Sequence, residues 1–212
     1  MTRAVHIAAK ALSIILYPLL IPTYGVGLFC YAFSHQVYPL PPVWTGVAVV
    51  GTLVLTLLLP VTAIGILIRQ GKVKDLEIAD AKQRTLPYLY TVFGFGCWWY
   101  LMHSILHAPT YITLATAGAT LAIILVSVIN HHWKISAHLS GTGGLVGGLM
   151  SYYAGIGVVP SWGVLSFCLT LSLLLMYARV RLEAHTPAQV CAGWLLGMAC
   201  TFLPYGIYSY VV

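Results

Sequence analysis

The stretch that decides the fold is VWTGVAVVGTLVLTLLLPVTAIGILI, Val43–Ile68, which contains no charged residue. A helix needs about 20 mostly apolar residues to cross the hydrocarbon core of a bilayer, and this run is longer. Of the 212 residues in the chain, 60% are hydrophobic and only 7% are charged, which is too apolar a composition for a soluble domain. The sequence therefore predicts an integral membrane protein.

Six further apolar runs have a similar character: Ala11–Phe33, Pro87–His107, Tyr111–Val128, Gly141–Val159, Ser161–Ala178 and Pro187–Val211. We expect an all-α, polytopic transmembrane helical bundle of six to seven spans that forms one domain over residues 1–212. The first run follows Arg3 and Lys10, as the apolar part of a signal peptide would. Its length and its internal Pro18 and Pro22 favour a membrane helix instead.

Charged side chains gather on one side of such a bundle. All ten Lys and Arg residues precede the first run or lie in alternate links, after the second, fourth and sixth runs, whereas the other links carry none. Short loops rich in Lys and Arg remain in the cytoplasm, which accounts for much of this asymmetry. A functional site is the second explanation, because the same surface also collects His138 and His185. The two explanations are compatible.

The segment KISAHLSGTGG, Lys134–Gly144, places Ser136 and His138 at the start of a glycine-rich helix. Free N–H groups and the positive end of the helix dipole favour an anion at such a position. Ser136 is able to cap the helix, and the small Ala137 lets a ligand approach the backbone. The alternative interpretation is an ordinary helix cap beside an interfacial histidine.

The segment YARVRLEAHTPAQVCAGWLLG, Tyr177–Gly197, places Arg179 six residues before His185, directly after an apolar run. A phosphoester is cleaved without metal if one histidine attacks phosphorus, a second protonates the leaving oxygen and cations neutralise the phosphoryl charge. A guanidinium group binds two phosphate oxygens at once. His138, Arg179 and His185 together fit this chemistry.

These residues resemble the type 2 phosphatidic acid phosphatases, the membrane relatives of the vanadium haloperoxidases. The third signature of that family is Ser-Arg, five residues, His, three residues, Asp, and here it reads Ala178-Arg179, His185 and Gln189. The second signature is Pro-Ser-Gly-His, and here it reads Ile135-Ser136-Ala137-His138. The resemblance covers residues 84–197.

The resemblance implies that His185 is the nucleophile, through a phosphohistidine, and that His138 is the general acid. It also implies that Arg179, Ser136 and the Ala137 N–H hold the phosphoryl oxygens. In the family an aspartate accepts a hydrogen bond from the second ring nitrogen of the nucleophile. Gln189 occupies that position here and brings an acceptor oxygen without a negative charge, so a weaker nucleophile is expected.

The first signature of the family, Lys, six residues, Arg-Pro, is matched less closely. If Arg84 is its arginine, Glu77 stands in the place of the lysine and Thr85 in the place of the proline. Lys82 and Arg84 are the candidate phosphate-binding cations of this segment, and an anchoring role in the cytoplasmic charge cluster is the alternative for Lys82.

We therefore expect a metal-independent lipid phosphatase without a cofactor, acting on a phosphate monoester or pyrophosphate of the phosphatidate, phosphatidylglycerophosphate or polyprenyl pyrophosphate type. Its partners are the lipid bilayer and the lipid substrate, with no nucleic acid. The expected location is a bacterial inner membrane, with the site on the Lys- and Arg-rich cytoplasmic face. The alternatives are a lipid phosphotransferase that uses the same histidine and a catalytically degenerate protein that binds or transports a phospholipid.

Overall fold

The computed structural model describes residues 3–37, 39–74 and 85–211, and within these ranges all regular secondary structure is helical. A π-helical turn at Val54–Leu58 joins α3 to α4 in one continuous rod, and another at Leu101–Ile105 extends α5. The helices are α1 (Arg3–Ile15), α2 (Ile21–Gln36), α3 (Pro42–Leu53), α4 (Leu59–Arg69), α5 (Thr85–Tyr100), α6 (Thr110–Ile129), α7 (Ala137–Ile156), α8 (Trp162–Arg181) and α9 (Pro187–Val211).

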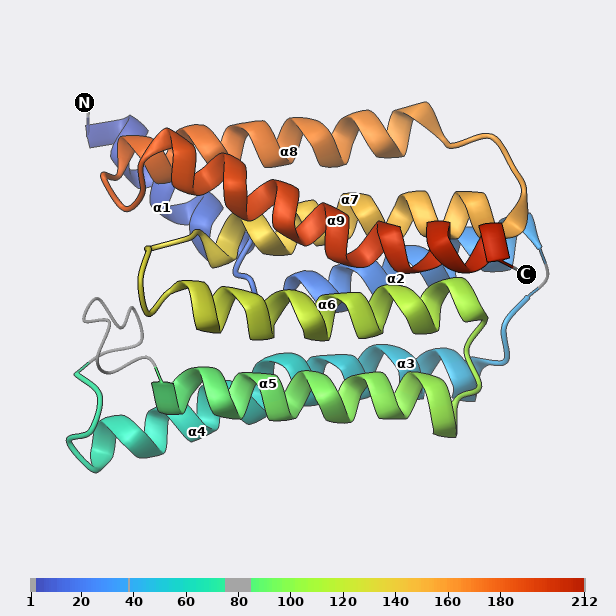
Figure 1. The fold of residues 1–212 in the computed structure, drawn as a ribbon, viewed down its shortest axis with the longest axis horizontal. Helices are drawn as coiled ribbons and strands as arrows, with labels where there is room; N and C mark the ends of the chain where they lie inside the picture. Colours follow the sequence, from blue (N-terminus) through green and yellow to red (C-terminus); the bar gives the residue numbers. More distant parts are fainter. Residues whose placement is uncertain (1–2, 38, 75–84, 212) are drawn as a thin grey trace.

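The helices lie along the long axis of the molecule in an up-and-down arrangement (Figure 1). The links α6–α7 and α8–α9 are at the same end as the N-terminus, and the links α2–α3, α5–α6 and α7–α8 are at the opposite end with the C-terminus. Helix α7 is central, because it packs against α2, α6, α8 and α9. Segments that are far apart in sequence therefore meet at one end of the bundle.

The first apolar run is two helices, where the sequence predicted one over Ala11–Phe33. Helix α1 ends at Ile15 and α2 begins at Ile21, with Pro18 between them. Proline has no N–H to donate, and its ring clashes with the carbonyl of the preceding turn, so the helix breaks there. Pro22 is tolerated because it lies in the first turn of α2. The break turns the chain beside the start of α7.

Four helices of the described chain are long and apolar enough to cross a membrane: the α3–α4 rod Pro42–Arg69, α6, α8 and α9. The expected all-α architecture is confirmed in this part of the chain, and so is the presence of several candidate spans. The predicted run Gly141–Val159 became α7, which is not among the four. Its many Gly, Ser and Thr residues make α7 less apolar, and they suit a helix that is enclosed by other helices.

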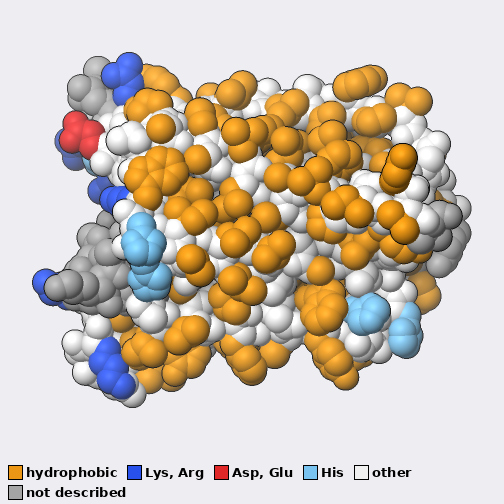
Figure 2. Space-filling model, viewed as in Figure 1, with side chains coloured by type: hydrophobic (Ala, Val, Ile, Leu, Met, Phe, Trp, Pro, Cys, Tyr) orange, Lys and Arg blue, Asp and Glu red, His pale blue; other side chains and the backbone are white. Residues whose placement is uncertain are grey.

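Every charged residue that the structure describes lies at the end of the bundle where the α6–α7 and α8–α9 links meet (Figures 1 and 2). In Figure 2 hydrophobic side chains cover the length of the visible face, and Lys and Arg appear only at that end. The predicted clustering of charge is thus confirmed for these residues. We refer to this part of the molecule as the charged end.

Glycines let α7 and α9 approach closely. A Cβ atom on Gly193 or Gly197 of α9 would collide with a backbone carbonyl of α7 or of the residue before it. On α7 the matching residues are Gly143 and Gly147, which approach the backbone of Trp194 and Met198. Gly144 also meets α9, because its backbone nitrogen would lie 2.9 Å from a Cβ atom on Gly197, and it lines a cavity together with Gly148.

Candidate functional site

A cavity of about 160 Å³ opens at the charged end, between the α1–α2 break, the first turn of α5 and the starts of α7 and α9. Four candidate residues from the two segments Lys134–Gly144 and Tyr177–Gly197 line it: Ala137, His138, Arg179 and His185. Lys134 joins them from the α6–α7 link. Arg179 is close enough to both rings to act on the charge of His138 and of His185. Residues that are distant in sequence therefore share one polar cavity.

The turn after α8 determines how Arg179 and His185 come together. The Ala184 N–H donates to the Arg179 carbonyl at 3.1 Å, and Glu183 adopts a left-handed conformation with φ of 54°. This is the hydrogen bond of a Schellman motif, in which the left-handed position is usually glycine. The motif reverses the chain within one turn, so that Arg179 in the last turn of α8 and His185 after it line the same cavity.

The hydrogen bonds of His185 determine its tautomer. Nδ1 lies 3.2 Å from the Lys134 carbonyl oxygen and 3.3 Å from Gln189 Oε1, and both of these oxygens are acceptors. Nδ1 therefore carries the proton, and Nε2 keeps its lone pair. Burial and the nearby Arg179 guanidinium lower the pKa of His185 to about 4, a shift that the two hydrogen bonds at Nδ1 oppose. At neutral pH the ring is uncharged.

The side-chain oxygen of Gln189 has two hydrogen-bond partners, His185 and Thr186. Oε1 accepts a hydrogen bond from the Thr186 N–H at 3.1 Å, while the Gln189 N–H donates to Thr186 Oγ1 at 3.4 Å. These reciprocal bonds form a capping box, the Thr-x-x-Gln arrangement that begins a helix. Gln189 thus initiates α9 and orients His185 with the same side-chain oxygen.

The start of α7 is attached to the start of α9. The Ser136 N–H donates to the Gln189 carbonyl at 3.3 Å, and Gly193 packs against the Ser136 carbonyl. The prediction that Ser136 caps α7 is wrong, because its hydroxyl makes no capping hydrogen bond. The Ser136 side chain is fully buried, and its Oγ has no hydrogen-bond partner among the residues that the structure describes. Packing against α9, rather than a side-chain cap, holds this helix start in place.

His138 is held by the segment before α2. Its Nε2 lies 3.2 Å from the carbonyl oxygen of Ser13, and the Tyr17 ring meets the imidazole edge to face with 5.8 Å between centroids. Because Ser13 O is an acceptor, Nε2 carries the proton in the neutral ring. Nδ1 of His138 is then the nitrogen that is able to exchange a proton with a ligand.

Four further polar residues line the cavity that sequence reasoning did not select: Tyr17, Tyr88, Thr91 and Asn130. Asn130 donates from Nδ2 to Tyr88 Oη at 3.1 Å and to the Val126 carbonyl at 2.9 Å. The sequence did contain one indication of this contact, because Asn130 ends an apolar run and a buried amide needs a hydrogen-bond partner. Nothing in the order of residues indicated that its partner comes from α5.

The remaining cations lie elsewhere. Arg181 packs over the ring of Tyr177, with its Cζ 5.1 Å from the ring centroid, on the exposed side of α8. Lys82 and Arg84, the candidates from the first signature, lie outside the described residues. The cations shown at the cavity are therefore Arg179 and Lys134.

Comparison of the chain with family models, with curated proteins and with solved structures finds no match. The functional argument therefore rests on the geometry of the cavity. In that geometry two imidazoles and a guanidinium group line one cavity, and the imidazole of His185 keeps a lone pair on Nε2. This combination is suited to binding an anion and to transferring a phosphoryl group.

Proposed function

We propose that this chain is a multi-span membrane protein that hydrolyses a phosphate monoester or pyrophosphate of a membrane lipid through a phosphohistidine at His185. The observation that carries the proposal is the pair of acceptor oxygens at Nδ1 of His185, which leaves Nε2 with a lone pair for attack on phosphorus. Its low pKa keeps the ring neutral at physiological pH. The partial resemblance to type 2 phosphatidic acid phosphatases supports the same assignment.

The reaction proceeds in two steps. First, Nε2 of His185 bonds to phosphorus as the bond between phosphorus and the leaving oxygen breaks. Burial and Arg179 lower the pKa of His138, so this ring takes up its second proton, at Nδ1, with the anionic substrate and then gives it to the leaving oxygen. Water then attacks the phosphohistidine, His138 Nδ1 takes a proton from this water, and phosphate is released from Nε2. Arg179 and the Ala137 N–H stabilise the phosphoryl oxygens throughout.

The proposal is tested by incubating the purified protein with phosphatidate, phosphatidylglycerophosphate and a polyprenyl pyrophosphate, and measuring released phosphate. His185→Ala is expected to lower the rate by about a hundredfold or more. His132→Ala is the matched control, because His132 is exposed and does not line the cavity. Acid-labile phosphate trapped on His185 during turnover is the second expected result. Equal release by His185→Ala would contradict the mechanism.

The charged end is proposed to face the cytoplasm of a bacterial inner membrane, because short loops rich in Lys and Arg remain on that side. The C-terminus lies at the other end of the bundle (Figure 1). An alkaline phosphatase domain fused to the C-terminus should therefore be active, whereas green fluorescent protein at that position should be dark. The opposite pair of results would put the site on the outer face.

A catalytically degenerate lipid-binding protein is the second candidate, and one observation favours it. Gln189 has a sufficient structural role in the capping box of α9, so its presence requires no catalytic explanation. A protein that binds the lipid phosphates without releasing phosphate from any of them would support this candidate. A new phospholipid formed when an acceptor alcohol is added would instead identify a phosphotransferase.

A further inference from the structure

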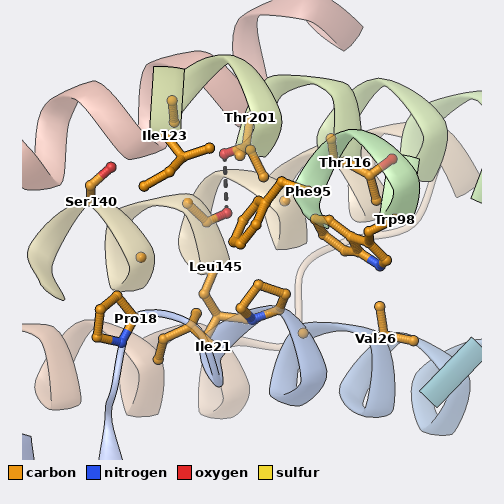
Figure 3. A pocket seen from close by; sticks show the side chains of 18 of the residues that line it. Pro18, Ile21, Val26, Phe95, Trp98, Thr116, Ile123, Ser140, Leu145 and Thr201 are labelled. Atoms are coloured by element: carbon orange, nitrogen blue, oxygen red, sulfur yellow. Dashed lines mark hydrogen bonds between the residues drawn. The ribbon is translucent and has the colours of Figure 1, made fainter. Parts of the chain in front are cut away.

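A second cavity, of about 130 Å³, lies deeper in the bundle between α2, α5, α6 and α7, with Thr201 of α9 at its wall (Figure 3). It begins where the polar cavity ends, because four residues line both: Pro18, Leu19, Ile123 and Ala137. It then follows α7 as far as Tyr152. At 1.5 Å per residue, the path from Ala137 to Tyr152 is about 22 Å long. We refer to this space as the inner cavity.

The inner cavity is apolar, even where hydroxyl-bearing residues line it. Thr116 donates its hydroxyl to the Thr113 carbonyl at 2.9 Å, and Thr201 donates to the Gly144 carbonyl at 3.0 Å. Both hydroxyls are thus satisfied by helix carbonyls. Cavities with such walls exclude water and accept apolar ligands. A hydrocarbon occupant is therefore favoured over an ion or a polar group.

Large side chains line the inner cavity at the end remote from the polar cavity. Met102 and Tyr152 are each only 1% exposed, and Trp98 is 4% exposed. The polar atoms of the two aromatic residues have partners elsewhere, since Tyr152 donates to Gln36 Oε1 at 2.7 Å and Trp98 donates to Thr52 Oγ1 at 2.9 Å. A hydrocarbon chain inside the cavity would therefore contact only apolar groups of these side chains at that end.

The width of the inner cavity depends on small residues. Gly144 and Gly148 of α7 line it, together with Ala115 and Ala119 of α6. A Cβ atom on Gly148 would lie 3.9 Å from Ala115 Cβ, an ordinary contact distance, so a larger side chain at this position would occupy the space. Its volume of about 130 Å³ is spread over a path of about 22 Å, so the cavity is narrow along its length and suits one hydrocarbon chain better than two.

We propose that the inner cavity holds the single hydrocarbon chain of the lipid whose phosphate enters the polar cavity. This inference rests on the proposed function and narrows its substrate to lipid phosphates with one chain, such as isoprenyl phosphates, over two-chain lipids such as phosphatidate. The phosphate binds at His138, Arg179 and His185, the chain passes Ala137, and its far end reaches Met102. Gly148, which has no side chain, keeps the cavity wide enough for the chain to pass.

Binding is tested without catalysis by a single-chain alkyl phosphate that carries a benzophenone at the end of its tail. After irradiation of the purified protein, peptide mass spectrometry should locate the cross-link near Met102, Trp98 or Tyr152. Farnesyl phosphate should compete for this cross-link, and dioleoyl phosphatidate should not. Cross-links confined to Phe167 and Leu173 on the exposed side of α8, or equal competition by phosphatidate, would overturn the proposal.

Gly148→Leu should reduce the Met102 cross-link by about tenfold or more, because its side chain fills the cavity. Gly27→Leu is the matched control, since Gly27 also lies in a helix, lines neither cavity and has open space at its Cβ position. Ala115→Leu provides a second obstruction from the opposite wall in case Gly148→Leu does not fold. An undiminished cross-link in a folded variant would contradict the proposed path.

The phosphatase proposal and the inner-cavity proposal fail in different ways. If no lipid releases phosphate but the Met102 cross-link is competed by farnesyl phosphate, the inner cavity holds the chain and the protein is a binder. If phosphate is released equally from farnesyl phosphate and phosphatidate, and the cross-link lies outside the bundle, the phosphatase proposal holds and the inner-cavity proposal is wrong. Loss of phosphate release in His185→Ala with an unchanged cross-link is the result expected if both proposals hold.

Discussion

At the scale of single residues, the site depends on which ring nitrogen of each histidine carries the proton and donates a hydrogen bond. His185 donates from Nδ1 to oxygens of Lys134 and Gln189, and His138 donates from Nε2 to the Ser13 carbonyl. The two rings are therefore held by opposite nitrogens. The Lys134 and Ser13 acceptors are backbone carbonyls, so the orientation of both rings depends on the path of the chain as well as on side chains.

The pKa of His185 gives a direct test of its environment. Because burial and Arg179 lower this pKa to about 4, the ring should remain neutral until the pH falls well below 6.5. The folded state then binds fewer protons than the unfolded state between those values, so stability should decline as the pH falls through this window. The ¹³Cε1 signal of labelled histidine, assigned with His185→Ala, measures the midpoint. A midpoint near 6.5 would contradict the burial of the ring.

Gln189→Glu should strengthen the nucleophile. Glutamate also satisfies a capping box, so α9 should begin as before, while its carboxylate places a negative charge near His185 Nδ1–H. The charge favours the imidazolium form, which should raise the pKa of His185 and stabilise the phosphohistidine step. The change is measured by the NMR titration and by phosphate release. Gln189→Ala is the control, which removes both the cap and the hydrogen bond and should lower stability by about 1 kcal/mol.

At the scale of elements, the starts and ends of helices form the site. The Schellman turn after α8, the capping box of α9, the uncapped start of α7 and the proline break before α2 all lie at the charged end. Each is a short-range feature, although the sequence predicted one helix across the break at Pro18. Their convergence is a property of how the helices pack.

Glu183 is the strained point of these elements. Its φ of 54° is unfavourable for a residue with a side chain by about 1–2 kcal/mol, and glycine removes that cost. Glu183→Gly should therefore raise stability by about 1 kcal/mol, measured by thermal unfolding in detergent. Glu183→Ala is the matched control, because it removes the charge and retains the strain. Equal effects of the two substitutions would mean that charge, not conformation, is responsible.

At the scale of the whole molecule, the packing of α7 on α9 holds the site together. Gly193 and Gly197 allow the contact that brings the Ser136 N–H to the Gln189 carbonyl. The same central helix carries Gly144 and Gly148, which form part of the wall of the inner cavity. One helix thus positions the polar cavity and shapes the apolar one.

Gly197→Ala tests this packing. Its methyl group would collide with the Ser140 carbonyl, so α7 and α9 would have to separate, at a cost of about 1–3 kcal/mol. Thermal unfolding in detergent measures the loss. Gly206→Ala on the same helix has open space around its Cβ position and should be neutral or slightly stabilising. If both substitutions were tolerated equally, the two helices would not be in the close contact described.

The sequence by itself determined that the described chain is helical and that its charged residues collect at one end, because both follow from runs of apolar residues and from counting alternate links. It also indicated His138, Arg179 and His185 as one group, since their spacing and residue types fit an anion site. The tertiary structure decided the tautomers, the participation of Tyr17, Tyr88 and Asn130, and the face of α7 that packs on α9. Those features depend on how far one helix is rotated and shifted along its axis relative to its neighbour. Side-chain packing determines this rotation and shift, and no periodic pattern in the sequence indicates them.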